Sequence, residues 1–207
     1  MLVKKNDFIE IEFTGYANDQ IFDTTNKKDA EKFGLNLKDI KPLTISVGNQ
    51  MVIQGLDEDL EGKETNTEYS VTISSEKAFG KRNPNMIKTY GINHFRKQNI
   101  NPYIGLTLQL DNLLAKIISV NGGRVTIDFN NPLAGKNITY KYKINKIVNE
   151  DEDKVNSLQD FFFKQRFDFE IKDKKVIFKD DKIKMFIDLL SQKFKEMTEL
   201  EFVMSEI

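Results

Sequence analysis

The chain has 207 residues, with 31 basic and 32 acidic side chains, a formal net charge of −1 and no cysteine. This length can bury a core and can hold one large domain or two to three small ones, and the near-neutral charge argues against nucleic acid or a membrane surface as the main partner. The lack of cysteine excludes disulfides and thiolate metal sites, and the single histidine, His94, excludes a histidine metal cluster or a catalytic triad.

The N-terminal residues turn polar at once and lack the apolar core of a signal peptide. No uninterrupted apolar run elsewhere approaches the length needed to span a bilayer. Together with the absence of cysteine, this pattern predicts a soluble protein of the cytoplasm, with no metal and no cofactor.

The N-terminal part of the chain is predicted to form short strands and one short helix. Apolar and polar residues alternate in residues 9–14, 43–47 and 69–73, which is the pattern of a half-buried strand. Between the last two segments, Leu56 and Leu60 lie four positions apart, as expected for one face of a short helix.

Residues 81–130 are predicted to be a separate, mostly β unit. It opens with the turn residues KRNPN, and apolar stretches follow at 106–110, 113–120 and 125–129. The Gly-Gly pair between the last two stretches favours a tight hairpin turn. The chain then returns to a long strand, with one face made of Ile138, Tyr140, Tyr142 and Ile144.

The C-terminal part is predicted to be a small α/β domain that either packs by itself or dimerises. Residues 149–153, NEDED, are interpreted as a solvated acidic joint, and Ser157 with Asp160 has the spacing of a capping box before Phe161–Phe163. A hairpin is expected across 167–178. One helical face and a final strand follow, with the helical positions Ile183, Phe186, Ile187, Leu190, Phe194 and Met197.

Two segments carry the chemistry: IFDTT at 21–25 and MVIQGL at 51–56. They place apolar side chains around the carboxylate of Asp23, with no Ser-His or Cys-His pair to act as a nucleophile. Such a site suits binding an apolar group and changing its shape. Periodicity alone favours ordinary core for each apolar residue, and Asp23 can be a simple turn residue. The acids within 57–61 are interpreted as solvated residues of a helix start.

At these residues the chain resembles the FK506-binding-protein (FKBP) family of peptidyl-prolyl cis/trans isomerases. The matching segments occur in the family's order: EFTG at 12–15, FDTT at 22–25, VG at 47–48, VIQGLD at 52–57 and AFG at 78–80. The break after Gly80 and the return at NPLAG, 131–135, are similar to the SlyD-like branch, in which a chaperone domain is inserted into the flap loop. The segment after about residue 148 resembles the extra C-terminal domain of long archaeal members.

The resemblance implies an α+β fold, with an FKBP-type antiparallel β-sheet wrapped on a short helix. The implied domains are the isomerase domain (1–80 with 131–149), the inserted mostly-β flap domain (81–130) and a small C-terminal α/β domain (154–207). The implied function is acceleration of X-Pro isomerisation in folding proteins, with chaperone activity in the insert. The implied partners are unfolded proline-containing polypeptides and, as weak ligands, macrocyclic inhibitors of the FK506 type.

The resemblance also implies site residues. The catalytic set is Phe22, Asp23, Val52, Ile53, Leu56, Phe79 and Tyr140. The backbone N–H of Ile53 would anchor a substrate carbonyl, and Asp23 would make a polar contact at the edge. Further substrate-binding residues are Phe13, Leu43 and Leu133 around the pocket and, in the insert, Ile100, Tyr103 and Ile104, with Leu113 and Leu114 beside them. The insert residues are assigned by composition, and filling a small core is an equal alternative for each.

Three positions depart from the family pattern. Phe13 and Phe79 stand where many members carry tyrosine, and Leu56 stands where eukaryotic members often carry tryptophan. The differences at Leu56 and Phe79 leave open an alternative function, that of a catalytically weak or inactive holdase or assembly scaffold. The chain also lacks the His-rich tail with which bacterial SlyD binds nickel, so no metal function is carried over.

Overall fold

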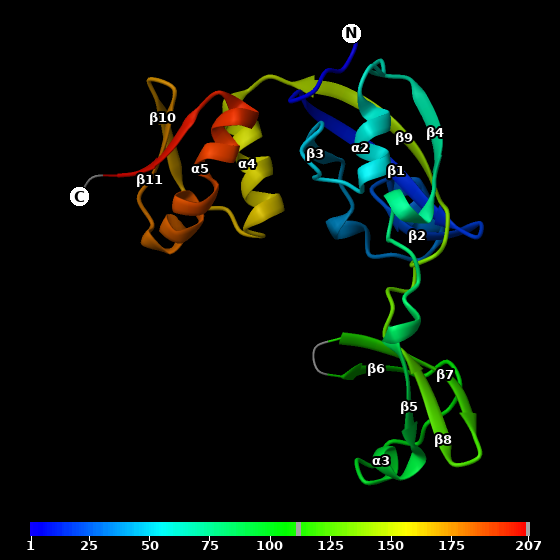
Figure 1. Ribbon diagram of the computed structural model, residues 1–207. Coiled ribbons are helices and arrows are strands. Elements are labelled where there is room, and N and C mark those ends of the chain that lie inside the picture. The colour runs from blue at the N-terminus through cyan, green and yellow to red at the C-terminus, as the bar shows by residue number, and fades with distance from the viewer. Residues whose placement is uncertain (111–112, 206–207) are drawn as a thin grey trace. The chain divides into compact units, whose positions relative to one another are not determined.

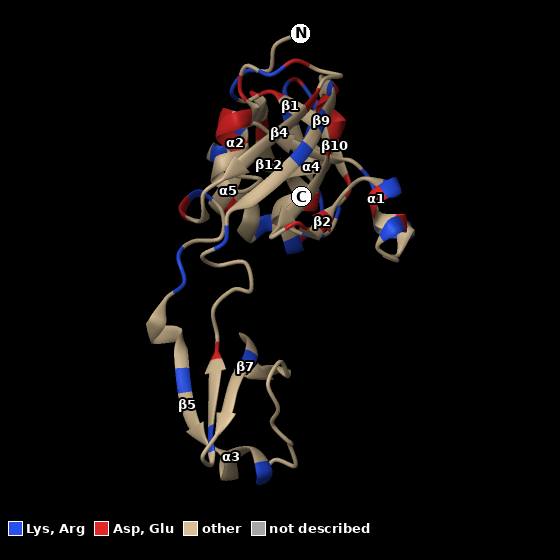
Figure 2. Cartoon of the chain, turned by 90° about the vertical axis from the view of Figure 1, so that its right-hand side faces the viewer, with Lys and Arg blue, Asp and Glu red and all other residues tan. Residues whose placement is uncertain are grey.

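The computed structural model describes residues 1–110 and 113–205 (Figure 1). It separates into two compact units, one formed by Met1–Ile73 with Ile138–Ile207 and the other by Ser74–Asn137. Within the described residues, no helix has the length and apolar character needed to cross a membrane. Acidic and basic residues are interspersed over the first unit, as the balanced net charge leads one to expect (Figure 2).

The first unit is built on an antiparallel sheet. Strand β1 (Phe8–Ala17) pairs along its whole length with β9 (Ile138–Val148), and β9 pairs on its other side with β4 (Glu68–Ile73). Two strands share the other edge of β1: β3 (Leu43–Ser46) pairs with its first half, and β2 (Gln20–Thr24) pairs with its second half. The expected strands and their alternation are therefore confirmed.

Helix α2 (Gln54–Leu60) packs against the apolar face of this sheet (Figure 1). Leu56 and Leu60 are almost completely buried, as the four-residue spacing predicts. A side chain at Gly55 would bring its Cβ within 2.3 Å of Ile73 Cγ2 on β4, so only glycine allows this approach. The core shared by helix and sheet is made of Ile9, Ile11, Ile45, Leu56, Leu60, Ile73, Ile138 and Ile144.

A short irregular connection joins β2 to β3. It contains helix α1 (Lys27–Lys32) and the 3₁₀ turn η1 (Leu37–Asp39). Asn26 and Asn36 cap these two elements, since their side-chain oxygens accept backbone N–H groups of the first turn. Three apolar side chains of the connection are exposed, namely Phe33, Leu35 and Leu37.

The C-terminal part has a sheet of its own, with the order β10-β11-β12. Strands β10 (Phe169–Lys172) and β11 (Lys175–Phe178) form the expected hairpin. Helix α5 (Lys184–Thr198), preceded by the turn η4 (Asp181–Ile183), then carries the chain to β12 (Glu201–Met204), which lies parallel to β11. Phe178, Phe194 and Phe202 pack in its core.

The interpretation of residues 149–153 as a solvated joint is wrong. Helix α4 runs over Asp151–Phe162, so these acids form its first turn, where carboxylates are stabilised by the exposed N–H groups and the helix dipole. Ser157 is not a cap but a buried mid-helix residue whose hydroxyl donates to the carbonyl of Lys154, 2.8 Å away. On α5, Phe186 is more exposed than the helical pattern predicts.

The second unit, Ser74–Asn137, contains a four-stranded sheet with the order β5-β8-β7-β6. The strands are β5 (Ile87–Gly91), β6 (Thr107–Leu110), β7 (Leu113–Asn121) and β8 (Arg124–Asp128), with the 3₁₀ turns η2 (Ser75–Lys77) and η3 (Pro84–Met86) before them. The predicted hairpin between β7 and β8 is confirmed, since Gly122 and Gly123 have φ of 56° and 75°.

Helix α3 (Ile92–Arg96) was not predicted; its Phe95 packs into the core of this unit with Ala115, Ile117, Val125 and Ile127. His94 lies exposed on the same helix and stacks on Tyr90. This position agrees with the expectation that His94 is a surface residue.

Candidate functional site

The first unit brings three of the predicted site residues into one aromatic cluster. The ring of Tyr140 meets Phe13 and Phe22 edge to face, with centroids 5.4 Å and 5.9 Å apart. Gly15 lies between them on β1, and a Cβ there would come within 2.7 Å of Phe22 Cζ and 2.9 Å of Tyr140 Cε1. The glycine of the EFTG segment therefore allows the rings to close over the strand.

Asp23 is next to this cluster on β2. The residue is exposed as a whole, but its carboxyl group is partly desolvated, which raises its pKa; a hydrogen bond from the backbone of Thr24 opposes the rise. The pKa of Tyr140 is raised as well, first by burial and then by the negative charge of Asp23. The two groups therefore lie within electrostatic reach of each other.

The segment before α2 contributes Val52 and Ile53, both half-buried. Ile53 is the N-cap residue of α2, and its carbonyl accepts the N–H groups of Leu56 and Asp57. Among the described residues, no hydrogen bond is formed by the backbone N–H of Ile53. A backbone donor is therefore available where the resemblance implies one. Leu56, in the first turn of α2, is 1% exposed.

The acids of α2 are not all solvated, which corrects the interpretation made from the sequence. Asp57 is buried, and its carboxylate accepts the backbone N–H groups of Gly48 and Gln50, each at 2.8 Å. It thus holds the turn that leads into Val52 and Ile53. The pattern VIQGLD contains this carboxylate, but sequence periodicity has no signal for a bond that runs from a helix back to the preceding turn.

Asp59 also has a structural partner. Its carboxylate accepts the hydroxyl of Tyr142 at 2.6 Å and lies 3.2 Å from the Lys63 ammonium group. Tyr142 in turn packs against Tyr69 on β4. Two acids of α2, Asp57 and Asp59, therefore accept hydrogen bonds that hold the fold together.

The remaining predicted residues are placed elsewhere. Leu43 is half-buried on β3 and lines a groove of about 380 Å³ together with Phe161 of α4. Phe79 and Leu133 belong to the second unit, where both are half-buried. Their contribution to the aromatic cluster stays a prediction.

The insert residues differ in exposure. The side chains of Tyr103, Ile104, Leu113 and Leu114 are between 51% and 67% exposed. Ile100 instead packs against the core of the unit, which is the alternative that the sequence left open.

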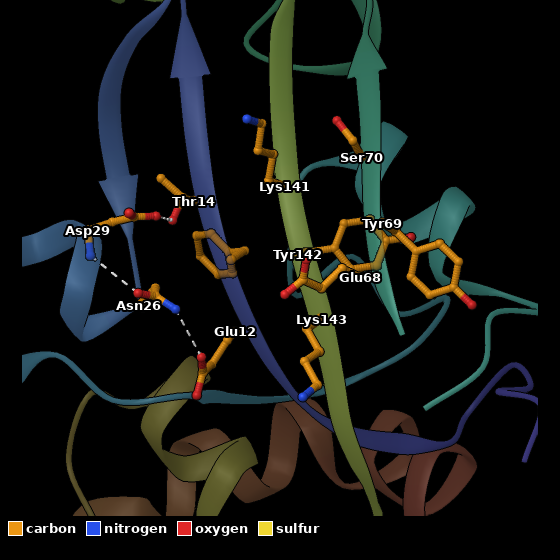
Figure 3. A pocket seen from close by; sticks show the side chains of 11 residues that line it. Glu12, Thr14, Asn26, Asp29, Glu68, Tyr69, Ser70, Lys141, Tyr142 and Lys143 are labelled. Carbon is orange, nitrogen blue, oxygen red and sulfur yellow. Dashed lines mark hydrogen bonds between the residues drawn. The ribbon is translucent and has the colours of Figure 1, made fainter. Parts of the chain in front are cut away.

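A separate hollow of about 410 Å³ lies over β1, β9 and β4 (Figure 3). Glu12, Thr14, Lys141 and Lys143 line it. Thr14 donates to Asp29 at 2.7 Å, and this bond is the main cause of the lowered pKa of Asp29. Because neighbouring side chains of a strand point to opposite faces, Lys141 projects away from the face that carries Tyr140. The charged side chains of the lining, Glu12, Asp29, Glu68, Lys141 and Lys143, make this hollow unlike an apolar proline site.

No group of three or more His, Cys, Asp or Glu side chains that could hold a metal ion is present in the part of the chain that the structure describes. The cluster offers the aromatic surfaces of Phe13, Phe22 and Tyr140, with the carboxylate of Asp23 beside them.

Comparison with known proteins agrees with this chemistry. Residues 2–95 match the family model of FKBP-type peptidyl-prolyl cis-trans isomerases, and residues 90–133 match the model described as FKBP26, IF domain. A short-type peptidyl-prolyl cis-trans isomerase of Methanocaldococcus jannaschii is 30% identical over 148 residues, which cover 70% of this chain and 94% of the relative.

Two bacterial proteins are also similar. The FKBP-type isomerase SlyD of Vibrio cholerae is 28% identical over 119 residues, covering 55% of this chain and 58% of that protein. A probable FKBP-type 16 kDa isomerase of Pseudomonas fluorescens is 31% identical over 111 residues, covering 51% of this chain and 73% of that protein. The chain therefore belongs to the family of FKBP-type peptidyl-prolyl cis-trans isomerases.

Proposed function

We propose that this protein accelerates X-Pro isomerisation at the aromatic cluster of the first unit. The observation that carries the proposal is the aromatic cluster of Phe13, Phe22 and Tyr140, with the charge of Asp23 acting on Tyr140. The chain has a single histidine and no cysteine, so no Cys-His pair can serve as a nucleophile. Val52 and Ile53 would close the site, and Leu56 would support them from below. The substrates are proline-containing polypeptides.

The physical basis is preferential binding of a twisted amide. Rotation about the peptide bond faces a barrier of about 18–20 kcal/mol, because the planar amide is stabilised by resonance. The twisted transition state has lost that resonance and its carbonyl is less polar, so an apolar, water-poor surface favours it over the planar form. Catalysis of this kind is differential binding and needs no covalent intermediate.

Two polar groups would orient the substrate. The free N–H of Ile53 is available for a substrate carbonyl, which would fix the chain beside the proline. Asp23, at the edge of the cluster, would make a polar contact with the same segment. Asp57 acts indirectly, because it holds the turn from which Ile53 projects.

The experiment is a proline-limited refolding assay. Uncatalysed X-Pro isomerisation takes on the order of 10–100 s at 25 °C, so a slow refolding phase is easily followed. The protein contains no tryptophan, so the fluorescence of a tryptophan-containing client is recorded without background. We expect the rate of the slow phase to rise in proportion to the protein concentration. A client that is held in solution with an unchanged slow phase would instead favour the holdase alternative.

We further propose residues 81–130 as a client-binding insert. The exposed apolar side chains Tyr103, Ile104, Leu113 and Leu114 support this role, since an unfolded segment can bury its own apolar residues against them. Tethering such a surface to the isomerase unit raises the effective concentration of client prolines.

The face of α5 suits a second copy of the chain, and we propose a homodimer through the C-terminal domain. Met185 and Leu189 lie one helical turn apart, and each is 77% exposed. We expect Met185→Asp combined with Leu189→Asp to convert a dimer into a monomer in light scattering. A wild-type monomer at all accessible concentrations would contradict the dimer.

Two narrower proposals concern ligands and compartment. We propose that macrocycles of the FK506 type bind weakly, because the buried aliphatic Leu56 offers less surface than an aromatic floor. Inhibition of the refolding assay only at high macrocycle concentration is the expected result.

We also propose a cytoplasmic location, since a chain without cysteine suits a reducing compartment.

A further inference from the structure

Two tyrosines of β9 differ in the surroundings of their hydroxyl groups. Tyr140 and Tyr142 are two positions apart on the same face of the strand, and they are 4% and 3% exposed. The hydroxyl of Tyr142 donates to Asp59 at 2.6 Å. No hydrogen bond to the hydroxyl of Tyr140 is formed within residues 1–110 and 113–205. Among the described residues, the fully buried side-chain N and O atoms without a partner are limited to Gln159 Nε2, so the Tyr140 hydroxyl reaches solvent. A free hydroxyl beside an apolar cluster can donate to a bound substrate.

The ring of Tyr140 is held in place by its neighbours. Phe13 and Phe22 contact the ring edge to face. Gly15 lies so close to it that a Cβ atom on Gly15 would come within 2.9 Å of Tyr140 Cε1. Burial and the charge of Asp23 both raise its pKa, so the hydroxyl keeps its proton throughout the physiological range and can serve as a donor. Tyr140 also carries the single hydroxyl among the predicted catalytic residues Phe22, Asp23, Val52, Ile53, Leu56, Phe79 and Tyr140.

We propose that the hydroxyl of Tyr140 donates a hydrogen bond to the nitrogen of the X-Pro peptide bond as that bond twists. The inference rests on the proposed isomerase function of the cluster. It makes Tyr140 a catalytic donor as well as part of the apolar surface. Tyr140 thereby replaces the hydroxyl donors that Phe13 and Phe79 do not provide.

The chemistry of the amide decides which atom receives the bond. In the planar amide the nitrogen lone pair is delocalised and is a poor acceptor, whereas in the twisted amide it is localised on the nitrogen and can accept. A donor placed on the carbonyl oxygen would instead stabilise the polar, planar resonance form and slow the rotation. The proton stays on Tyr140 throughout, and no covalent bond forms or breaks. A contact made only in the transition state raises kcat and leaves KM little changed.

The test compares Tyr140→Phe with Tyr142→Phe in the full chain. Isomerisation of a short X-Pro peptide gives kcat and KM separately, and thermal unfolding gives Tm for each variant. We expect Tyr140→Phe to lower kcat about tenfold, the effect of one modest hydrogen bond in the transition state, with KM little changed. Its Tm should be equal to that of the wild type or higher, because no internal bond is lost. Tyr142→Phe is the matched control, which should lower Tm and keep kcat.

Three results would overturn the inference while the isomerase function stands. The first is an unchanged kcat for Tyr140→Phe. The second is a higher KM with the same kcat, which would place the bond in the ground state. The third is a loss of Tm equal to that of Tyr142→Phe, which would make the hydroxyl structural. A wild-type protein without any isomerase activity would contradict the proposed function itself, and the inference with it.

Discussion

Among single residues, Asp23, the carboxylate of the proposed site, carries an electrostatic cost. Its carboxyl group is partly desolvated beside the aromatic cluster, and this raises its pKa above the usual value of 3.8. The folded state therefore holds the proton more tightly than the unfolded state does. Stability falls as the pH rises from about 3.8 through the raised pKa, and the penalty persists at higher pH.

Asp23→Asn tests this electrostatic cost. The amide keeps the shape of the side chain but cannot ionise, so the variant should gain Tm relative to the wild type at pH 7. At pH 3, where the wild-type carboxyl is protonated, the two proteins should be much closer. Calorimetry at the two pH values measures the difference. A gap in Tm that does not change with pH would show that desolvation of Asp23 has no effect on stability.

Among secondary-structure elements, the contact between α2 and β4 fixes the loop that carries Val52 and Ile53 of the proposed site. The loop that carries Val52 and Ile53 enters α2, whose Gly55 touches Ile73 of β4 without a side chain between them. Any displacement of α2 therefore moves the free N–H of Ile53.

Gly55→Ala tests this contact. Its new Cβ would lie 2.3 Å from Ile73 Cγ2, so either the helix or the strand must shift. We expect a loss of about 1–3 kcal/mol in the free energy of unfolding, typical of overpacking, and a lower kcat/KM on peptides. Gly91→Ala is the control, since no atom lies within 4 Å of its Cβ position and the substitution should change little. Equal effects of the two variants in urea unfolding would contradict the packing argument.

At the level of the whole molecule, the protein is built from units with separate cores. The insert has a core around Phe95, Ile117 and Ile127, and its base is tied by Asn130, whose side chain bonds Asn83 at 2.8 Å and 3.1 Å. These two residues mark a place where the chain can be shortened. Removal of the insert should therefore leave the first unit able to fold.

Deletion of residues 84–129, with two glycines joining Asn83 to Asn130, tests the role of the insert. We expect peptide isomerisation to keep most of its rate, while catalysis of protein refolding falls by about tenfold or more, because the client is no longer held near the site. Tyr103→Ser with Ile104→Ser is the smaller variant and should have the same effect in part. An equal loss on peptides and on proteins would refute tethering.

Much of the fold could be predicted because its signals are local. The alternation in β1, β4 and β9 and the glycine pair of the β7–β8 hairpin are visible within a few residues of sequence. The acidic start of α4 was misread because a run of charges is compatible with a joint as well as with a helix end. The role of Asp57 could not be predicted, since helix periodicity does not indicate which acids turn inward.

The sequence by itself determined the order of the elements, the absence of a nucleophilic pair and the segments that carry the family resemblance. Only the tertiary structure decided which polar groups have partners. The bond from Tyr142 to Asp59 spans 83 positions, and the contact between Asn145 and Glu10 spans 135. Such pairs form only when the folded chain brings β9 beside α2 and β1, which no local preference specifies. For that reason the free hydroxyl of Tyr140 is a property of the folded chain.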